Sequence, residues 1–255
     1  MSSSAKRALK ILATVGESGR PMGVTEIART LHIAPGTAFR GLDALCRAHL
    51  LARDPRAPRY GVGPAALGLR QSLLEQFRIR DVAMPYLRQL ASATGETCAL
   101  YVRIGWYAAC VATAPGSAEM TSGTILNGLQ PLSAHVAGRA ILAHITHNQI
   151  VRYRAWATAR RIVISKTFER DLAAIRAQGF ARALPPESGA LAVPILKSDQ
   201  AFAAVLSEGE GAGANQPGPK GQEIAEEIAA LVRANPALAH QPFDQFDPDD
   251  IVLPS

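Results

Sequence analysis

The chain has 255 residues with 27 lysines and arginines against 21 aspartates and glutamates, giving a formal net charge of +6. This length allows one large domain or two modest ones, each with its own core. Residues 1–80 carry 13 basic and 5 acidic side chains, whereas residues 81–255 carry 14 and 16. This segregation favours a polyanion-binding module followed by a domain with another task.

The cysteine count and the hydropathy pattern bear on the cellular compartment. The three cysteines have no CxxC spacing, which argues against a disulfide framework. No signal peptide and no run of about 18 apolar residues is visible. We therefore expect a cytoplasmic protein without a membrane segment.

The first elements of the chain are three predicted helices. Residues 4–17 form an amphipathic helix that glycines and Pro21 bring to an end. Two helices joined by a tight corner at residues 32–34 follow. Thr25 is the predicted cap of the first, with Glu26 in its first turn. Pro35 is favoured at the start of the second, because its missing N–H costs nothing there.

The second of these helices has one apolar stripe, with Ala38, Leu42 and Leu45 at helical spacing. The residues on the outside of its first two turns are Gly36, Thr37, Phe39 and Arg40. This layout is typical of a helix-turn-helix, in which the start of the second helix enters the major groove of DNA. Any two amphipathic helices with a short turn show a similar pattern, so the next segment decides between the two interpretations.

That next segment reads as a basic β-hairpin. Two short β-prone runs, residues 50–54 and 59–62, flank a turn-rich stretch. A basic hairpin directly after a helix-turn-helix is a wing. We expect Arg53, Arg56 and Arg59 to lie along DNA phosphates, where they add salt-dependent affinity without sequence information.

A leucine-rich helix is predicted over residues 65–77. Leu67, Leu69, Leu73 and Leu74 are too many apolar residues for an isolated exposed segment. We interpret it as a linker helix that also packs against a partner subunit. The alternative is a helix packed only on its own domains.

The remainder of the chain alternates helices and strands. We predict helices at residues 82–94, 134–146, 148–156, 168–178 and 221–234, and strands at residues 97–104, 107–113, 119–126, 180–184, 190–196 and 202–207. Helices on one side of a largely antiparallel sheet make an α+β domain. Residues 208–220 are expected to form a flexible loop, and residues 235–255 a weakly ordered tail.

Taken together, these segments resemble the IclR-type bacterial transcriptional regulators over nearly the whole length. The matching stretches are KRALKIL, ESGRPMGVTEIARTL, TAFRGLDAL, LLARD, RYGVGPAALGL, YLRQLASATGET, GLQPLSAHVAGRAILA, FERDLAAIRAQGFA and LAVPIL. The resemblance implies a winged helix-turn-helix at residues 1–63, a linker helix at residues 64–80 and a GAF/PAS-like α+β effector-binding domain at residues 81–234. It also implies a dimer or a dimer of dimers on a palindromic double-stranded DNA operator.

The recognition helix departs from the family where Pro35-Gly36 replaces a polar pair. Thr37 and Arg40 match the family pattern, so we expect these two side chains to read bases. Arg40 suits bidentate contact with guanine, and a phosphate contact is the alternative. The predicted DNA-contacting residues are Thr25, Gly36, Thr37, Phe39, Arg40, Arg53, Arg56 and Arg59.

The effector-binding segment departs further. The family usually has His, Thr and Cys at the positions that Ser133, His135 and Ala190 occupy in this chain. Leu206 and Glu208 replace two serines that the family has late in the domain. The start of the helix after Ser133 could dock a small carboxylate. The predicted effector-binding residues are Ser133, His135, Val136, Ala137, Ala190, Leu206 and Glu208. The familiar polar set is mostly missing, so the pocket either takes a different, larger or more apolar ligand or has lost ligand control.

We find no catalytic, cofactor or metal motif. GxSxG, Walker and dinucleotide patterns are missing, and His144 and His147 lack a third ligand at metal spacing. A His135–Glu208 acid–base pair is the one catalytic arrangement that folding could create. The competing hypothesis is a constitutive DNA-binding protein whose second domain only oligomerises. A small-molecule effector would distinguish the two by shifting operator affinity or melting temperature.

Overall fold

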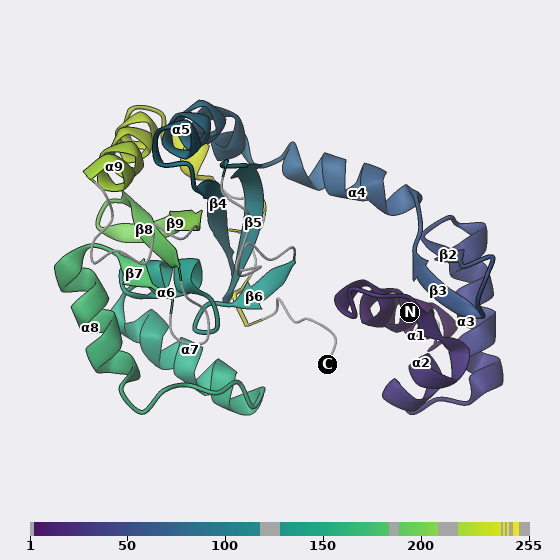
Figure 1. Cartoon of the computed structure of the whole chain (residues 1–255). Helices are drawn as coiled ribbons and strands as arrows, with labels where there is room; N and C mark the ends of the chain where they lie inside the picture. Colours follow the sequence, from purple (N-terminus) through teal and green to yellow (C-terminus); the bar gives the residue numbers. More distant parts are fainter. Residues whose placement is uncertain are drawn as a thin grey trace. The chain divides into compact units, whose positions relative to one another are not determined.

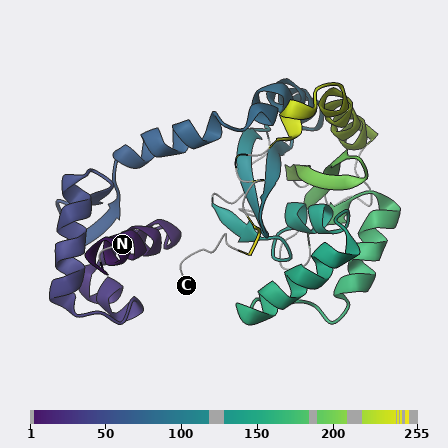
Figure 2. The same ribbon diagram turned by 180° about the vertical axis from the view of Figure 1, so that it is seen from behind.

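The computed structural model of the protein describes residues 3–117, 128–183, 189–208, 219–240, 242, 244 and 247–249. Contacts between residues divide the chain into two units, one reaching to Glu75 and the other beginning at Gln76. Figures 1 and 2 show the elements of each unit from opposite sides. No helix in these ranges is long and apolar enough to cross a bilayer.

The first unit is a small helical domain with a three-stranded sheet. Its elements are α1 (Ser3–Glu17), β1 (Met22–Gly23), α2 (Val24–Thr30), α3 (Pro35–Arg47), β2 (Leu51–Arg53), β3 (Arg59–Val62) and α4 (Ala65–Leu74). The strands pair antiparallel in the order β1-β3-β2. The predicted helix pair and hairpin are confirmed. The two-residue strand β1 was not predicted, because it is too short to show an alternating pattern.

The core of this unit forms where α1, α2 and α3 meet. Ile11, Ile27 and Leu42 are fully buried there, as expected for apolar residues at helical spacing. A side chain in place of Gly41 would bring its Cβ within 2.5 Å of the Ile11 side chain. A larger residue at this position would therefore have to displace the end of the Ile11 side chain in the core between α1 and α3.

The start of α2 differs from the prediction. Gly23 is the N-cap, and no side chain accepts a hydrogen bond there. Thr25 lies inside the helix and is exposed. The reason is tertiary: β1 pairs with β3 through Gly23 and Arg59, so the chain stays extended to Gly23 and can become helical at Val24.

The second unit is built on one antiparallel sheet. Its elements are α5 (Arg78–Thr94), β4 (Thr97–Ile104), β5 (Tyr107–Ala114), β6 (Leu129–Pro131), α6 (Val136–Leu142), α7 (His147–Ala159), α8 (Phe168–Gln178), β7 (Ala181–Arg182), β8 (Ala190–Lys197), β9 (Gln200–Glu208), α9 (Pro219–Ala234) and the 3₁₀ helix η2 (Pro236–Ala239). Within the described ranges the strand order is β6-β5-β4-β9-β8-β7. This confirms the α+β class.

Helices cover both faces of this sheet, which corrects the expectation of helices on one side (Figures 1 and 2). Leu191 and Val193 of β8 pack with Ala225 of α9 on one face. On the opposite face, the ring of Tyr101 from β4 lies against His135 at the start of α6. Successive residues of β4 and β8 are buried, so both faces need a covering layer.

Several predicted boundaries also need correction. The linker helix ends at Leu74. Helix α5 begins four residues before the predicted start, and its N-cap is Phe77. Phe77 and Ile79 are both buried. Helix α6 is shorter than predicted at both ends, because residues 134–135 and 143–146 are not helical. The predicted strand at residues 119–126 lies outside the described residues, as does most of the loop predicted at residues 208–220.

Part of the C-terminal segment, which was predicted to be a weakly ordered tail, lies within the described residues. Residues 236–239 form η2, and Ala239 is buried. Asp249 accepts a hydrogen bond from the indole N–H of Trp106 at 2.6 Å. A fully buried indole donor needs an acceptor, and the sequence alone does not show which carboxylate provides it.

Candidate DNA interface and effector site

The exposed side of α3 presents the predicted base-reading residues together. Ala38, Leu42 and Leu45 are buried, which leaves Thr37 and Arg40 on the outward side. The Arg40 guanidinium donates to Thr37 Oγ1 at 3.3 Å. Arginine, with its fork of N–H donors, is therefore held at the first two turns of α3, where a recognition helix meets base edges.

Two further residues on this surface lack a structural explanation within the unit. The ring of Phe39 is 53% exposed, although burying an aromatic ring is favourable. A Cβ added to Gly36 would meet no atom within 4 Å, so packing does not require glycine there. An exposed aromatic ring beside an open glycine position suits a surface that another molecule covers.

The wing presents arginines of two different kinds. Arg53 and Arg56 are exposed and line a shallow surface pocket of about 470 Å³ with Asp54. The Arg56 backbone N–H donates to Asp54 Oδ1 at 2.8 Å, which fixes the turn. Arg59 instead donates to the Pro21 carbonyl at 3.1 Å and lies 3.9 Å from a Glu26 oxygen. Arg59 is therefore already bound within the unit.

Glu26 organises this corner, a role that sequence reasoning missed. Its carboxylate pairs with both Arg20 and Arg59. The hydrogen bond from Arg20 holds the pKa of Glu26 below its ordinary value. Glu26 thus connects the segment before β1, the start of α2 and the wing. Its place in the first helical turn was visible in the sequence, but its partners were not.

The sheet register brings three predicted effector-site residues to one face of the second unit. Ala190 pairs with Glu208 across β8 and β9, and Leu206, two residues from Glu208, points to the same side. Tyr101 belongs to this face, because it pairs with Ala204 of β9. Its ring centroid lies 4.5 Å from that of His135. His135 therefore lies over the face that carries Ala190, Leu206 and Glu208.

Side chains of the protein satisfy the polar groups at the start of α6. His135 Nδ1 accepts from the Ala137 N–H at 3.3 Å. The Ser133 N–H donates to the Tyr153 hydroxyl at 2.8 Å, and that hydroxyl donates to Ser133 Oγ at 2.7 Å. Burial raises the pKa of Tyr153. Sequence reasoning missed Tyr101 and Tyr153, because only the tertiary fold brings them to this segment.

This face is densely packed in the described structure. His135, Ala190, Leu206 and Glu208 are between 0 and 3% exposed. Val136 and Ala137 are fully buried as well, whereas Ser133 is half-buried. The predicted effector residues thus form a buried cluster at the sheet, with Ser133 at its margin.

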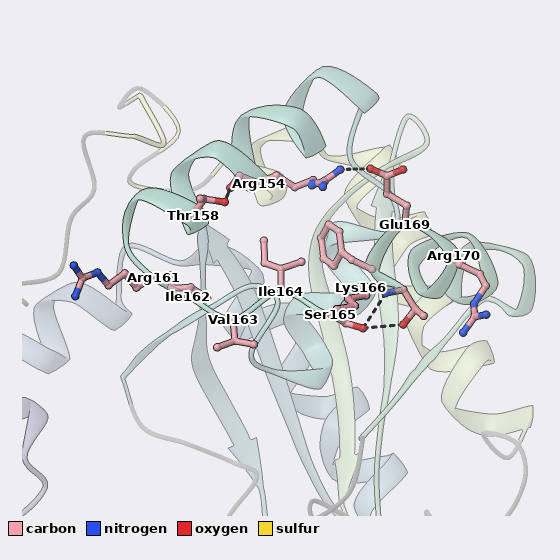
Figure 3. A pocket seen from close by; sticks show the side chains of 12 residues that line it. Arg154, Thr158, Arg161, Ile162, Val163, Ile164, Ser165, Lys166, Glu169 and Arg170 are labelled. Atoms are coloured by element: carbon pink, nitrogen blue, oxygen red, sulfur yellow. Dashed lines mark hydrogen bonds and ion pairs between the residues drawn. The ribbon is translucent and has the colours of Figure 1, made fainter.

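An open pocket of about 680 Å³ lies elsewhere, between α7 and α8 (Figure 3). Arg154 donates to Glu169 across it at 2.5 Å. The side chains of Arg161 and Arg170 point away from one another, and Val163 reaches its rim, as Figure 3 shows. The cations do not converge on one point, so this pocket has no centre for an anion. Among the described residues, no cluster of three or more His, Cys, Asp or Glu could hold a metal ion.

Comparison with known proteins decides the family. Residues 4–55 match the IclR helix-turn-helix domain, and residues 71–206 match the C-terminal domain of the bacterial transcriptional regulator IclR. The chain belongs to the IclR family. It is a DNA-binding transcriptional regulator of this family, and the resemblance seen in the sequence is confirmed.

Individual relatives are distant in sequence. The glycerol operon regulatory protein of Streptomyces griseus is 28% identical over 70% of this chain and 71% of its own. The transcriptional repressor AllR of Escherichia coli is 24% identical over 57% of this chain, and the match spans 54% of that repressor.

Solved structures show the same fold. An IclR regulator from Alicyclobacillus acidocaldarius has a TM-score of 0.69 at 24% identity, covering 92% of this chain and 98% of that one. An IclR homologue from Microbacterium hydrocarbonoxydans, solved in complex with 4-hydroxybenzoate, has a TM-score of 0.70 at 20% identity, covering 91% and 98%. At these identities the likeness establishes the fold.

Proposed function

We propose that this IclR-family protein is a ligand-responsive regulator that binds a palindromic operator as a homo-oligomer, either a dimer or a dimer of dimers. In this proposal residues 1–63 bind DNA, residues 64–80 are the linker, and residues 81–234 bind the effector and the partner subunit. The observation that carries the proposal is the exposed start of α3, where Thr37 and Arg40 contact one another on a helix whose other side is buried.

The proposed readout assigns a different task to each set of contacts. Arg40 holds a guanine edge bidentately, which discriminates by about 1–3 kcal/mol against a wrong base. Thr37 lies beside it, and Gly36 and Phe39 let the helix approach the groove closely. Arg53 and Arg56 bind phosphates from the wing, with Thr25 and Arg59 at the margin of the interface.

Exposed leucines support the homo-oligomer. Leu67, Leu69 and Leu73 of α4 are 71, 62 and 37% exposed. Leu69 and Leu73 are four residues apart and share one side of the helix. A second copy of the chain would bury them, at about 1.5–3 kcal/mol for each side chain fully covered.

The proposed effector is a small organic or aromatic acid that binds at the α6 face. The solved relative in complex with 4-hydroxybenzoate supports an aromatic acid as the first ligand to test. In the proposed mechanism the effector changes the arrangement of the two subunits through the linker, and so the spacing of the recognition helices on half-sites about 34 Å apart.

The packing of the α6 face favours a second candidate function. The N–H of Ala137 is already capped by His135, Ser133 is bound to Tyr153, and Glu208 is only 2% exposed. A ligand would have to displace some of these contacts. A constitutive regulator, whose second domain only oligomerises, would keep them intact.

Operator binding tests both candidates. The experiment is a gel shift on the DNA upstream of the protein's own gene, at two salt concentrations and with a panel of organic and aromatic acids. Specific binding that one acid changes is the expected result. Specific binding that no acid changes would favour the constitutive regulator, and the absence of specific binding would refute both.

The role of Arg40 has its own test in the same assay. Arg40→Ala should lower the preference for operator over random DNA by about 5- to 150-fold for each half-site, the equivalent of one guanine contact in that half-site. Arg47→Ala is the matched control, because it removes the same charge from the end of α3, where Arg47 pairs with Asp43. If Arg40→Ala keeps the preference of the wild type, Arg40 does not read a base.

A further inference from the structure

A pocket with several cationic side chains lies in the C-terminal unit, lined by residues other than the predicted effector residues. It has a volume of about 530 Å³, and its basic side chains are Arg103 of β4, Arg152 of α7 and Lys197 of β8. Asp244 and Pro248 of the C-terminal segment line it as well. This segment lies beyond residue 206, where the match to the family domain ends.

Carboxylates of the C-terminal segment bind at this pocket. Arg152 donates to Asp247 Oδ1 at 2.6 Å and to Asp249 Oδ2 at 2.8 Å. The indole N–H of the fully buried Trp106 donates to Asp249 Oδ1 at 2.6 Å. One guanidinium and one indole therefore hold two carboxylates that are two residues apart.

The neighbouring Arg103 adds a second positive charge at this place. Its guanidinium carbon lies 5.1 Å from the centre of the Trp106 ring, and its Nε donates to the Gly105 carbonyl at 2.9 Å. Burial lowers the pKa of Arg103 to about 10, with the carboxylate of Asp244 opposing the shift and the charge of Arg152 adding to it. Without the C-terminal carboxylates, the like charges of Arg103 and Arg152, whose guanidinium carbons lie 5.1 and 6.0 Å from the centre of the Trp106 ring, would disfavour one another.

We propose that this pocket is a binding site for small dicarboxylates and that the Asp247–Asp249 segment occupies it as an intramolecular competitor. A dicarboxylate with a short carbon chain can reproduce the two contacts that Asp247 and Asp249 make with Arg152. A monocarboxylate can reproduce only one of them. The tethered segment acts at a high effective concentration, so the intact chain binds an external ligand weakly until the segment leaves.

Calorimetric titration of the full-length chain tests this. Succinate is the probe, and butyrate, which has the same chain length and one carboxylate, is the control at matched ionic strength. The Asp247→Asn/Asp249→Asn variant should bind succinate at least tenfold more tightly than the wild type, with little change for butyrate. Adding Arg152→Gln to this variant should abolish succinate binding.

A charge-matched variant separates specific competition from a general change in net charge. Glu226→Gln/Glu227→Gln removes two adjacent negative charges from the exposed side of α9 and should leave succinate affinity as in the wild type. Equal succinate affinity in the wild type and the Asp247→Asn/Asp249→Asn variant would overturn the proposal. So would the absence of succinate binding by that variant when circular dichroism shows it folded.

A single substitution provides the test if the double variant does not fold. Asp247→Asn keeps the bond between Trp106 and Asp249 and removes one carboxylate from Arg152. It should tighten succinate binding at least threefold relative to the wild type. Unchanged affinity in this variant would overturn the proposal.

Discussion

The wing arginines give the most quantitative prediction for DNA binding. Arg56 is exposed, whereas Arg59 is bound to the Pro21 carbonyl and lies near Glu26. We therefore expect Arg56→Gln to remove a phosphate contact. Each phosphate contact contributes about 0.9 to the slope of log affinity against log salt concentration. When the salt concentration rises fourfold, a subunit that lacks one contact therefore loses about 3.5-fold less affinity than the wild-type subunit. A dimer in which both copies carry Arg56→Gln should differ from the wild type by about 12-fold.

Fluorescence anisotropy of a labelled operator between 50 and 200 mM salt measures this difference. Arg47→Gln is the control, because it removes the same charge from a residue already paired with Asp43, and its slope should match that of the wild type. Arg59→Gln should change the slope less than Arg56→Gln and lower the melting temperature instead, since it removes the hydrogen bond to the Pro21 carbonyl. An unchanged slope in Arg56→Gln would refute the wing contact.

Three further predictions concern stability. Asp199, in the two-residue turn between β8 and β9, has a φ of 66°. Asp199→Gly should therefore relieve roughly 1 kcal/mol of backbone strain and raise the melting temperature of the second unit by about 2–4 °C. Asp199→Ala should lower the melting temperature, and the reverse order of the two variants would contradict the prediction. Tyr153→Phe removes the hydroxyl that makes two hydrogen bonds with Ser133 and should lower the free energy of unfolding in denaturant by about 1–3 kcal/mol. No loss of stability would show that water replaces the hydroxyl. The Arg20 hydrogen bond lowers the pKa of Glu26, so the contribution of Glu26 to stability is complete above its ordinary pKa of 4.5 and is lost as pH falls through the lower folded-state pKa. Glu26→Gln should therefore make the melting temperature depend less on pH between pH 6 and pH 3. Parallel melting-temperature profiles for the wild type and the variant would count against the ion pair.

Local patterns in the sequence determined the elements whose signals lie within a few residues. The spacing of Ala38, Leu42 and Leu45 predicted α3 and its outward side, and Pro35 marked its start. Helix α8 was predicted at its observed bounds, Phe168–Gln178. The structure shows how it ends: Gly179, directly after it, has a left-handed φ of 82°, which glycine adopts without strain. The family followed from the order of such segments along the chain.

Only the tertiary structure decided features that depend on partners far apart in sequence. Thr25 lost its capping role because β1 pairs with a strand more than 30 residues later. The near-continuous apolar runs of β4 and β8 are typical of a sheet covered on both faces, but only the tertiary structure shows which helices cover each face. The carboxylate of Asp249 is held by Trp106, 143 residues earlier in the chain. Most buried donors and charges have a partner, but the sequence neighbourhood of a donor does not say which residue that partner is, since the fold alone brings the two together.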